Sequence, residues 1–495
     1  MEEQKRNLSR KLREAETIYD VLVILYAFVD NENAPGNIQN YYEQGNLQDW
    51  SEINQLLDEL LYCEISFSFF LEKLCSLMQN YYDSFIPIHI LKMFDQIFKE
   101  KDQYPYLEFG RKIEVNYLHE IGPLNHNQKE YCLYLSGNSG LIKESKAIKK
   151  SNCRFMKRKD GSDILAEISG YRIVRVIPDR KPLIKIKEYK SEIFDKKEEK
   201  ELRVAIVPLS KEKWFNINYQ ENPFGKNYFF ITDTKQKEED INKCYMELLD
   251  RAISQKAEIV IFPELAMNSS TETEIQKYLQ RKSLQTNDYT LKLIFLGSVW
   301  KNESNTCVLI SGKGTVLCRN EKKNPFSTMR EGKEYFEKLS KRPMKYELLD
   351  IKDLGRILYV VCKDGLDDID QVSFWNEYEV NFEVISSLSP SISYFDRQMS
   401  DMVEKYMGIA FVSNSCCERV QEKEDKKIIG FIKAPYMRKR KPFRVQGLNS
   451  EYYMDNDCMK KCTLCTCMHI FDIKPDVLNK NKTWSGMQID YTRIC

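Results

Sequence analysis

Histidine is scarce in this sequence of 495 residues. Only four are present, His89, His119, His126 and His469, so none falls between positions 127 and 468. A cysteine–histidine dyad within that long stretch is therefore excluded, because the imidazole that would activate the thiol is missing. Nucleophilic chemistry in this part of the chain would need a different base.

Long apolar runs and an excess of one charge are missing as well. No run approaches the roughly 20 apolar residues that a membrane span needs, and residues 1–16 are charged throughout, without the apolar core of a signal peptide. Lys and Arg number 75 against 74 Asp and Glu, a formal net charge of +1. No global field therefore attracts nucleic acid or anionic lipid, and we expect a cytoplasmic protein without a membrane partner.

The N-terminal part predicts two regions of different kind. Residues 1–105 are expected to be helical, because apolar residues recur at three- and four-residue steps over 53–77 and again over 90–98. Residues 106–188 are expected to form a small β-rich region, since the period shortens toward two in Tyr131–Leu135, Ile164–Ile168 and Tyr171–Ile177, with glycines at 137, 140 and 170 where hairpins would turn. Neither region contains a motif that indicates a chemical activity.

A new domain is predicted after the charged linker of residues 189–202. From residue 203 to 435, apolar strands alternate with amphipathic helical segments, and continuous apolar strands suit a sheet that is covered on both faces. Glycines at 312 and 314 predict a hairpin, and hence antiparallel pairs within the sheet. The fold class is therefore α/β, with residues 436–495 as a basic and cysteine-rich extension.

Three residues of this domain have side chains suited to nucleophilic catalysis. Glu264 follows the apolar strand EIVIFP, and Cys362 ends the strand GRILYVVC, with Gly365 placed to allow a tight turn behind it. Lys322 follows the strand GTVLCR. Because open α/β sheets gather their sites at the carboxyl ends of strands, we expect a thiol, a carboxylate and an ammonium group to meet there.

The order FPEL, a strand followed by lysine, and GRILYVVCKDG resembles the glutamate, lysine and cysteine motifs of the nitrilase superfamily of carbon–nitrogen hydrolases. This resemblance covers residues 203–435 and implies a four-layer α-β-β-α sandwich. It also implies that Cys362 is the nucleophile and Glu264 its general base. Lys322, together with the backbone N–H of Lys363, would stabilise the tetrahedral intermediate.

The resemblance leaves some assignments open. Many members use a second glutamate after the lysine; Glu331 is the nearest match and Glu334 its competitor. Lys323 adjoins Lys322, which we prefer for its distance of eight residues from Gly314. Residues KDG follow the cysteine where tyrosine or glutamate and then aspartate are commoner, although Asp364 keeps the acidic position.

The implied function is a thiol-dependent hydrolase that cleaves a non-peptide carbon–nitrogen bond through an acyl-cysteine intermediate. An amide is favoured over a nitrile as the small-molecule substrate, and no catalytic cofactor is expected. The alternative is a nitrilase-fold binding or sensor module that has lost activity and works within a larger assembly. A role in bacterial defence is an analogy only, because nitrilase-like domains there are fused to reverse transcriptases and no YxDD sequence occurs here. Family precedent also implies a homo-oligomer.

A cysteine cluster near the end of the chain predicts a structural metal site. Thiolate and imidazole groups at such short spacing suit zinc, with Cys416 and Cys417 as distant candidates; an iron–sulfur cluster is a weaker option. Free or partly buried thiols are the alternative, because the regular pairing of a zinc ribbon is missing. The candidate ligands are Cys458, Cys462, Cys465, Cys467 and His469.

A basic run, APYMRKRKPFRV, includes Arg438, Lys439, Arg440, Lys441 and Arg444. Such a run could contact a phosphate group or nucleic acid, but it is more often a solvated turn. Phe443 is the only aromatic residue among these cations, so the run gives weak support for nucleic-acid binding.

Overall fold

The structure is a computed structural model. It describes residues 2–31, 50–61, 64–80, 85–99, 118–121, 131–135, 171–175, 183–189, 201–209, 215–233, 238–286, 288–340, 345–351, 354–366, 375, 378, 380–406, 408–415, 428–440, 444–455, 467–476 and 486–494. The chain divides into two units, one formed by Met1–Gly137 and Ala147–Lys181, the other by Asn138–Lys146 and Pro182–Cys495.

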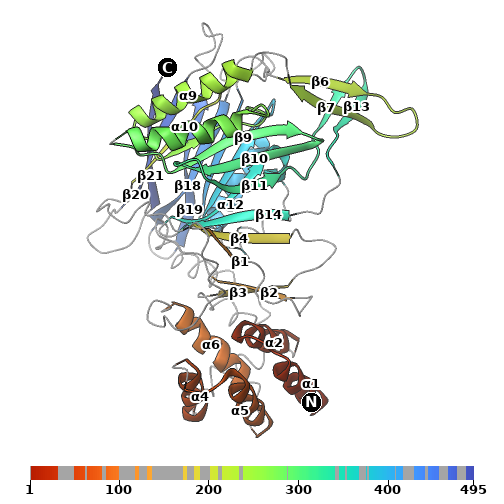
Figure 1. Cartoon of the computed structure of the whole chain (residues 1–495), viewed down its shortest axis with the longest axis vertical. Coiled ribbons are helices and arrows are strands. Elements are labelled where there is room, and N and C mark those ends of the chain that lie inside the picture. Colours follow the sequence, from red (N-terminus) through yellow and green to blue (C-terminus); the bar gives the residue numbers. More distant parts are fainter. Residues whose placement is uncertain are drawn as a thin grey trace. The chain divides into compact units, whose positions relative to one another are not determined.

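Helices dominate the first unit, as the apolar spacing predicts. The stripe over residues 53–77 forms two helices rather than one, and the later stripe forms a third. Their apolar faces share one core that includes Leu22, Leu57, Phe70 and Phe94. The helices are α1 (Glu2–Arg13), α2 (Ile18–Asn31), α4 (Ser51–Leu61), α5 (Phe67–Asn80) and α6 (Phe85–Lys99) (Figure 1). None of the helices in the described part of the chain is long and apolar enough to cross a membrane.

Strands of the predicted β-rich region belong to both units. In the first unit, β2 (Tyr131–Leu135) pairs antiparallel with β3 (Tyr171–Arg175), close to the predicted bounds, and β1 (Leu118–Ile121) precedes them. The last strand of the region, β4 (Leu183–Tyr189), instead pairs in parallel with β14 of the second unit. The predicted strand at Ile164–Ile168 and the glycines at 137, 140 and 170 lie outside the described residues.

One large mixed sheet forms the centre of the second unit. The strands that the sequence predicts between residues 203 and 435 all take part in it, including the antiparallel hairpin at Gly312 and Gly314. In order across the sheet they are β4, β14 (Lys345–Ile351), β15 (Gly355–Val361), β16 (Phe382–Ser387), β17 (Ile409–Asn414), β18 (Ile428–Arg440), β21 (Gly486–Ile494), β20 (Met468–Asp476), β5 (Leu202–Ile206), β8 (Ile259–Ile261), β9 (Leu293–Lys301), β10 (Ser304–Ser311) and β11 (Val316–Glu321), with β19 (Arg444–Asp455) beside β18.

The sheet folds back so that its two halves pack face to face. The ring of Phe295 on β9 lies edge-on to that of Tyr359 on β15, with centroids 4.9 Å apart. Asn320 Nδ2 donates to the Tyr359 carbonyl across the same interface at 2.8 Å. These contacts between distant strands make two central β layers.

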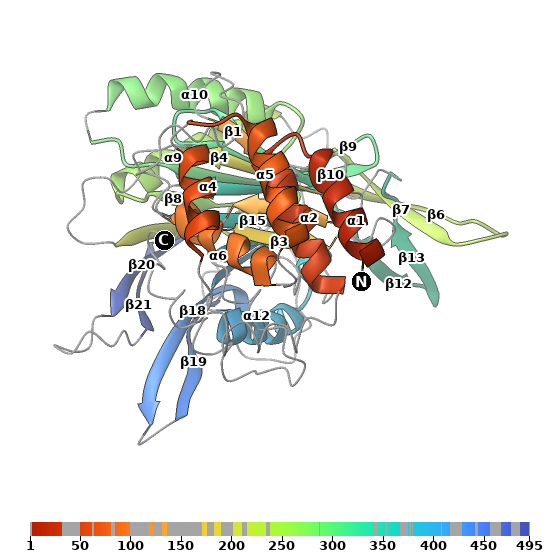
Figure 2. The ribbon, with the colours of Figure 1, turned by 90° about the horizontal axis from the view of Figure 1, so that it is seen from below.

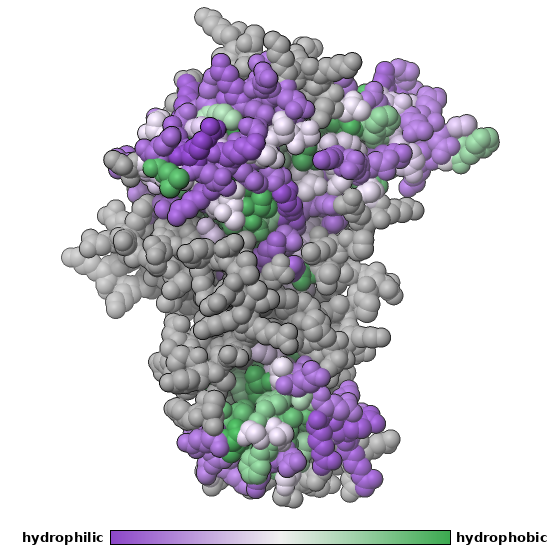
Figure 3. Space-filling view, in the orientation of Figure 1, coloured by the Kyte–Doolittle hydropathy of each residue, from purple (hydrophilic) through white to green (hydrophobic). Residues whose placement is uncertain are grey.

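Helices cover the outer faces of the two β layers. α9 (Glu238–Ser254) and α10 (Thr271–Gln285) share a core with β5, β8, β9 and β10. α12 (Ser393–Tyr406) lies on the opposite side, where its Asp396 pairs with Lys433 of β18 at 2.8 Å (Figure 2). The face over α9 and α10 is mainly hydrophilic, as expected for an outer layer (Figure 3). The predicted four-layer α-β-β-α fold is confirmed.

The unit extends beyond the predicted boundary at residue 435. Residues 468–476 form β20, which lies between β21 and β5, so the C-terminal segment belongs to the sheet rather than to an extension. The guanidinium of Arg203 on β5 pairs with the Asp472 carboxylate on β20, at 2.5 and 2.7 Å. Periodicity could not reveal this pairing, because it joins strands far apart in the sequence. Of the predicted linker, residues 190–200 lie outside the described part.

A second, smaller sheet is formed by segments in which the sequence pattern predicted no strand. Its order is β12 (Ser327–Arg330), β13 (Lys333–Glu337), β7 (Asn227–Asp233) and β6 (Phe215–Gln220). It packs on the loops of the large sheet through Phe215, Ile231 and Leu265, with Leu388 alongside. In Figure 1 these strands extend beside β9 and β10. We call them the small sheet.

Candidate active site

Cys362 begins a short 3₁₀ turn, Cys362–Leu366, directly after β15. Its backbone adopts the left-handed region, with φ at +46°, which a residue other than glycine rarely occupies. The sequence predicts that Gly365 allows the tight turn. In the structure, the residue of this turn with left-handed backbone is Cys362 instead. Gly365 is needed for close packing instead, because a Cβ there would lie 2.5 Å from the Ile385 side chain.

Glu264 lies in the loop after β8, three residues beyond the strand. Gly297 of β9 allows this loop to approach closely, because a Cβ at that position would lie 2.1 Å from the Pro263 carbonyl oxygen. The carboxylate accepts a hydrogen bond from the backbone N–H of Leu388, at 2.8 Å to Oε2. Residue 388 follows β16, whose last residue, Ser387, donates its hydroxyl to Cys362 Sγ at 3.7 Å. The end of β16 therefore contacts both the thiol and the carboxylate.

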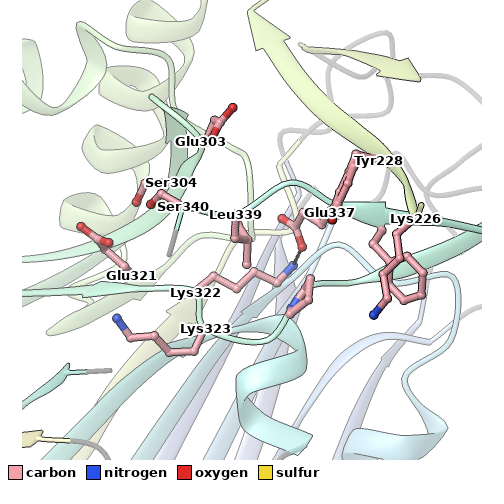
Figure 4. Close-up of a pocket in the computed structure, with 12 residues that line it drawn as sticks. Lys226, Tyr228, Glu303, Ser304, Glu321, Lys322, Lys323, Glu337, Leu339 and Ser340 are labelled. Carbon is pink, nitrogen blue, oxygen red and sulfur yellow. Dashed lines mark ion pairs between the residues drawn. The ribbon is translucent and has the colours of Figure 1, made fainter. Parts of the chain in front are cut away.

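The ammonium group of Lys322 pairs with two glutamates. One is Glu264, the predicted base, and the other is Glu337, which the sequence analysis did not single out. Lys322 Nζ lies 2.9 Å from Glu264 Oε1 and 2.8 Å from Glu337 Oε2 (Figure 4 shows the second pair). The three side chains are only 2–3% exposed. Asn305 of β10 donates its amide to Glu264 Oε1 at 2.8 Å and to Glu337 Oε1 at 3.4 Å. We call Glu264, Lys322, Glu337 and Asn305 the polar centre.

Burial controls the ionisation of these groups. It raises the pKa of Glu264, an effect that Lys322 opposes and Glu337 reinforces. For Lys322 burial acts against the charge, but the two glutamates and Cys362 outweigh it and keep the pKa well above its usual value. Burial, with the negative field of Glu264, raises the pKa of the Cys362 thiol to about 12 against the opposing effect of Lys322. The resting nucleophile is therefore a thiol, which needs a base at the moment of attack.

Asp364 joins the turn of the nucleophile to the segment that carries the lysine. Its carboxylate accepts the backbone N–H groups of Lys323 and Asn324, at 2.9 and 2.8 Å. Burial raises the Asp364 pKa to about 7, although these N–H groups and the nearby lysines favour the charged form. The two segments that follow β11 and β15 are thus held together next to the polar centre.

Glu331, the expected second glutamate, lies elsewhere. It occupies the turn between β12 and β13 with its side chain 82% exposed, paired with Arg330. Its competitor Glu334 is also exposed, whereas Glu337, at the end of the same hairpin, is buried. The β12–β13 hairpin lies between Lys322 and Glu337, so the buried glutamate comes later in the sequence than the spacing from the lysine predicts. The alternation in KEYFE, with Tyr335 and Glu337 on one face, was the available signal.

Of the two candidate lysines, only Lys322 joins the polar centre. The ammonium group of Lys323 lies over the ring of Tyr346, 5.9 Å from its centroid. In Figure 4 the two side chains diverge, Lys322 toward Glu337 and Lys323 away from it. The side chain of Lys363 also points out of the centre, because its Nζ donates to the Pro325 carbonyl at 3.0 Å.

Most of the proposed metal ligands, Cys416, Cys417, Cys458, Cys462 and Cys465, lie outside the described residues. Cys467 is buried and disulfide-bonded, so its sulfur is not a free thiolate in this structure. The imidazole of His469 is buried and hydrogen-bonds the Tyr491 hydroxyl through Nδ1 at 2.8 Å. Among the described residues, no group of three or more metal-binding side chains is gathered.

Similarities to known proteins are found among solved structures. No family model and no curated protein matches the sequence. Among solved structures, the chain is similar to a nitrilase-superfamily amidase from Nesterenkonia AN1, at 11% identity and a TM-score of 0.31, over 43% of this chain and 76% of the amidase. A glutamine-dependent NAD+ synthetase from Acinetobacter baumannii is similar at 12% identity and a TM-score of 0.29, over 55% of this chain and 45% of the synthetase.

Proposed function

We propose that this protein is a thiol hydrolase of amides. The observation that supports the proposal is the convergence of three strand ends. Cys362 follows β15, Glu264 follows β8 and Lys322 follows β11. Lys322 pairs with Glu264 at 2.9 Å, and both charges shift the pKa of the Cys362 thiol. A buried base and a buried cation beside a thiol are what acyl transfer through a cysteine requires.

The reaction begins with attack of the Cys362 sulfur on the amide carbonyl carbon, while Glu264 accepts the thiol proton. Lys322 and the Lys363 N–H stabilise the negative oxygen of the tetrahedral intermediate. The carbon–nitrogen bond then breaks, and Glu264 returns the proton to the departing amine, which leaves a thioester on Cys362. Water, deprotonated by Glu264, attacks this thioester and releases the carboxylic acid and the free thiol.

Glu337 and Asn305 act through the orientation of these groups. Glu337 pairs with Lys322 at 2.8 Å, as Glu264 does at 2.9 Å, and the Asn305 amide donates to both carboxylates. Because Glu264 Oε1 already accepts bonds from Lys322 and Asn305, the positions of the base and the cation are coupled. Such an arrangement reduces the reorganisation needed when charge develops on the substrate.

The test is mass spectrometry of the full chain quenched during turnover of a primary amide, combined with ammonia release. We expect an acyl adduct on the peptide that contains Cys362, and a rate loss on the order of 10⁴- to 10⁶-fold in Cys362→Ala. Cys244→Ala is the matched control, because Cys244 is another buried cysteine but belongs to α9. Undiminished turnover in Cys362→Ala would exclude the hydrolase and favour the binding module.

A further inference from the structure

A cavity of about 270 Å³ lies between strands β6 and β7 of the small sheet and the polar centre. Its walls come from β6 and β7 on one side and from the loops after β8 and β16 on the other. The lining side chains include Phe215, Ile217, Phe229, Ile231, Leu265 and Leu388. Glu264, Lys322 and Glu337 form its inner end. We call this cavity the apolar chamber.

Charged partners for a substrate are missing from the chamber wall. Among the described residues that line it, the charged ones are Glu264, Lys322 and Glu337, and these pair with one another at 2.9 and 2.8 Å. A charged substrate group placed against the phenylalanines and isoleucines would lose its water without gaining an opposite charge, which is strongly unfavourable. The chamber therefore selects against charge.

The neighbouring hollow on the other side of β7 has the opposite character. It measures about 390 Å³ and is lined by Lys226, Glu303, Glu321 and Lys323, among others, with Lys322 and Glu337 shared (Figure 4). Alternation along β7 separates the two, because Phe229 faces the chamber and Tyr228 faces the hollow. The apolar lining is thus a property of one face of the strand.

The volume of the chamber also limits the size of the group that it can hold. An apolar cavity of roughly 150 Å³ can hold a benzene-sized ring. The chamber therefore has room for one ring or one branched chain together with the amide carbon, but it is smaller than the ~300 Å³ at which pockets for drug-sized ligands begin.

We propose that the apolar chamber holds the acyl group of the substrate, and that the substrate class is uncharged amides with an apolar, ring-sized acyl group. This inference rests on the proposed hydrolase function. Phenylacetamide represents the class. The anion succinamate and the cation glycinamide are of comparable or smaller size and carry the charge that the chamber excludes.

The experiment compares kcat/KM for these three amides, measured by ammonia release with the full chain. We expect phenylacetamide to exceed both charged amides by about 100-fold or more, the range in which shape and polarity of a pocket discriminate substrates. Ile217→Lys places a cation at a half-buried position of the wall and should narrow or reverse the preference over succinamate. Tyr228→Lys, on the opposite face of the small sheet, is the matched control and should leave the preference unchanged.

Binding to Cys362→Ala separates the two proposals. If the wild-type chain hydrolyses none of the amides, yet Cys362→Ala binds phenylacetamide in calorimetry and Ile217→Lys abolishes that binding, the chamber assignment holds and the hydrolase does not. If amides are hydrolysed but succinamate or glycinamide is preferred, the chamber assignment is overturned. The same holds if Ile217→Lys and Tyr228→Lys have equal effects on the preference.

Discussion

The polar centre and the apolar chamber adjoin each other but are built in opposite ways. In the polar centre, Lys322 pairs with Glu264 and Glu337 at 2.9 and 2.8 Å, and Asn305 donates to Glu264 at 2.8 Å. Each of these side chains comes from a strand of the large sheet, from a segment that follows one, or from the end of β13. The chamber wall is mainly aliphatic and aromatic, and much of it comes from β6 and β7 of the small sheet. The chemistry and the selection of substrate are thus carried largely by different sheets.

This difference determines which substitutions each region tolerates. Apolar packing tolerates exchange of one apolar side chain for another of similar volume, whereas a buried charge network fails when one partner is removed. The chamber can therefore change its substrate preference while the polar centre is retained. The following variants test whether the two regions really respond so differently.

Lys322→Met should have the largest effect, because it removes the cation that lies between two buried carboxylates. We expect a loss of about 3–5 kcal/mol in the free energy of unfolding, measured with urea, and no detectable amide turnover. The triple variant Lys322→Met, Glu264→Gln, Glu337→Gln removes all three charges and should regain most of the stability but none of the activity. If the single variant is as stable as the wild type, the polar centre is not a charge network.

Glu337→Gln and Glu331→Gln form a matched pair on the same hairpin. The first removes a carboxylate that lies 2.8 Å from Lys322, and we expect kcat to fall by about 10²-fold. The second changes an exposed side chain, so stability should stay within about 0.5 kcal/mol and turnover should be unchanged. Steady-state kinetics on both variants decides between the two glutamates, and the reverse order of effects would restore Glu331 as the second glutamate.

Asn305→Ala should have an intermediate effect. It removes hydrogen bonds to two buried carboxylates, and we expect a loss of about 1–3 kcal/mol in the free energy of unfolding. Asn218→Ala, which removes an exposed hydrogen bond to Thr232 in the small sheet, is the control and should cost less than about 0.5 kcal/mol. Equal losses would mean that the Asn305 amide does not orient the centre.

Asp364→Asn should alter the pH dependence of stability. The folded-state pKa of Asp364 is raised to about 7, above the ordinary value of about 3.9, so the folded protein binds more protons between these values. This carboxyl therefore lowers the free energy of unfolding as pH rises from about 4 to about 7, by at most about 1.4 kcal/mol per pH unit. In Asp364→Asn that part of the slope should vanish. If the free energy of unfolding, measured with urea, changed equally with pH in the wild type and in Asp364→Asn, the assignment would be contradicted.

The sequence predicted the parts of the molecule that depend on local pattern. The apolar strands predicted an α/β sheet, and the places of Glu264, Lys322 and Cys362 at or after strand ends predicted that their side chains converge. The four layers of the sandwich were implied by the resemblance to the nitrilase superfamily. Lys322 could be chosen over Lys323 from its distance to Gly314, because the single strand β11 connects that glycine to the lysine. These features depend on residues close together in the chain.

The features that the sequence did not predict depend on contacts between distant segments. Glu337 was missed because the β12–β13 hairpin lengthens the path from Lys322, and exposure rather than spacing separates it from Glu331. The chamber was missed because β6 and β7 are short and half-buried, and because β7 pairs in parallel with β13, about a hundred residues further along the chain. A pattern of apolar residues cannot show which remote strand will cover it.

The pair between Arg203 and Asp472 spans 269 positions of the chain, since it joins β5 to β20. During synthesis on the ribosome, β5 emerges early and has one side unpaired until residues 468–476 have left the exit tunnel. The sandwich therefore cannot be completed while translation is in progress through Glu264, Lys322 and Cys362. Nascent chains that stall between those positions and β20 should expose the unpaired edge of β5, and we expect chaperones to bind them.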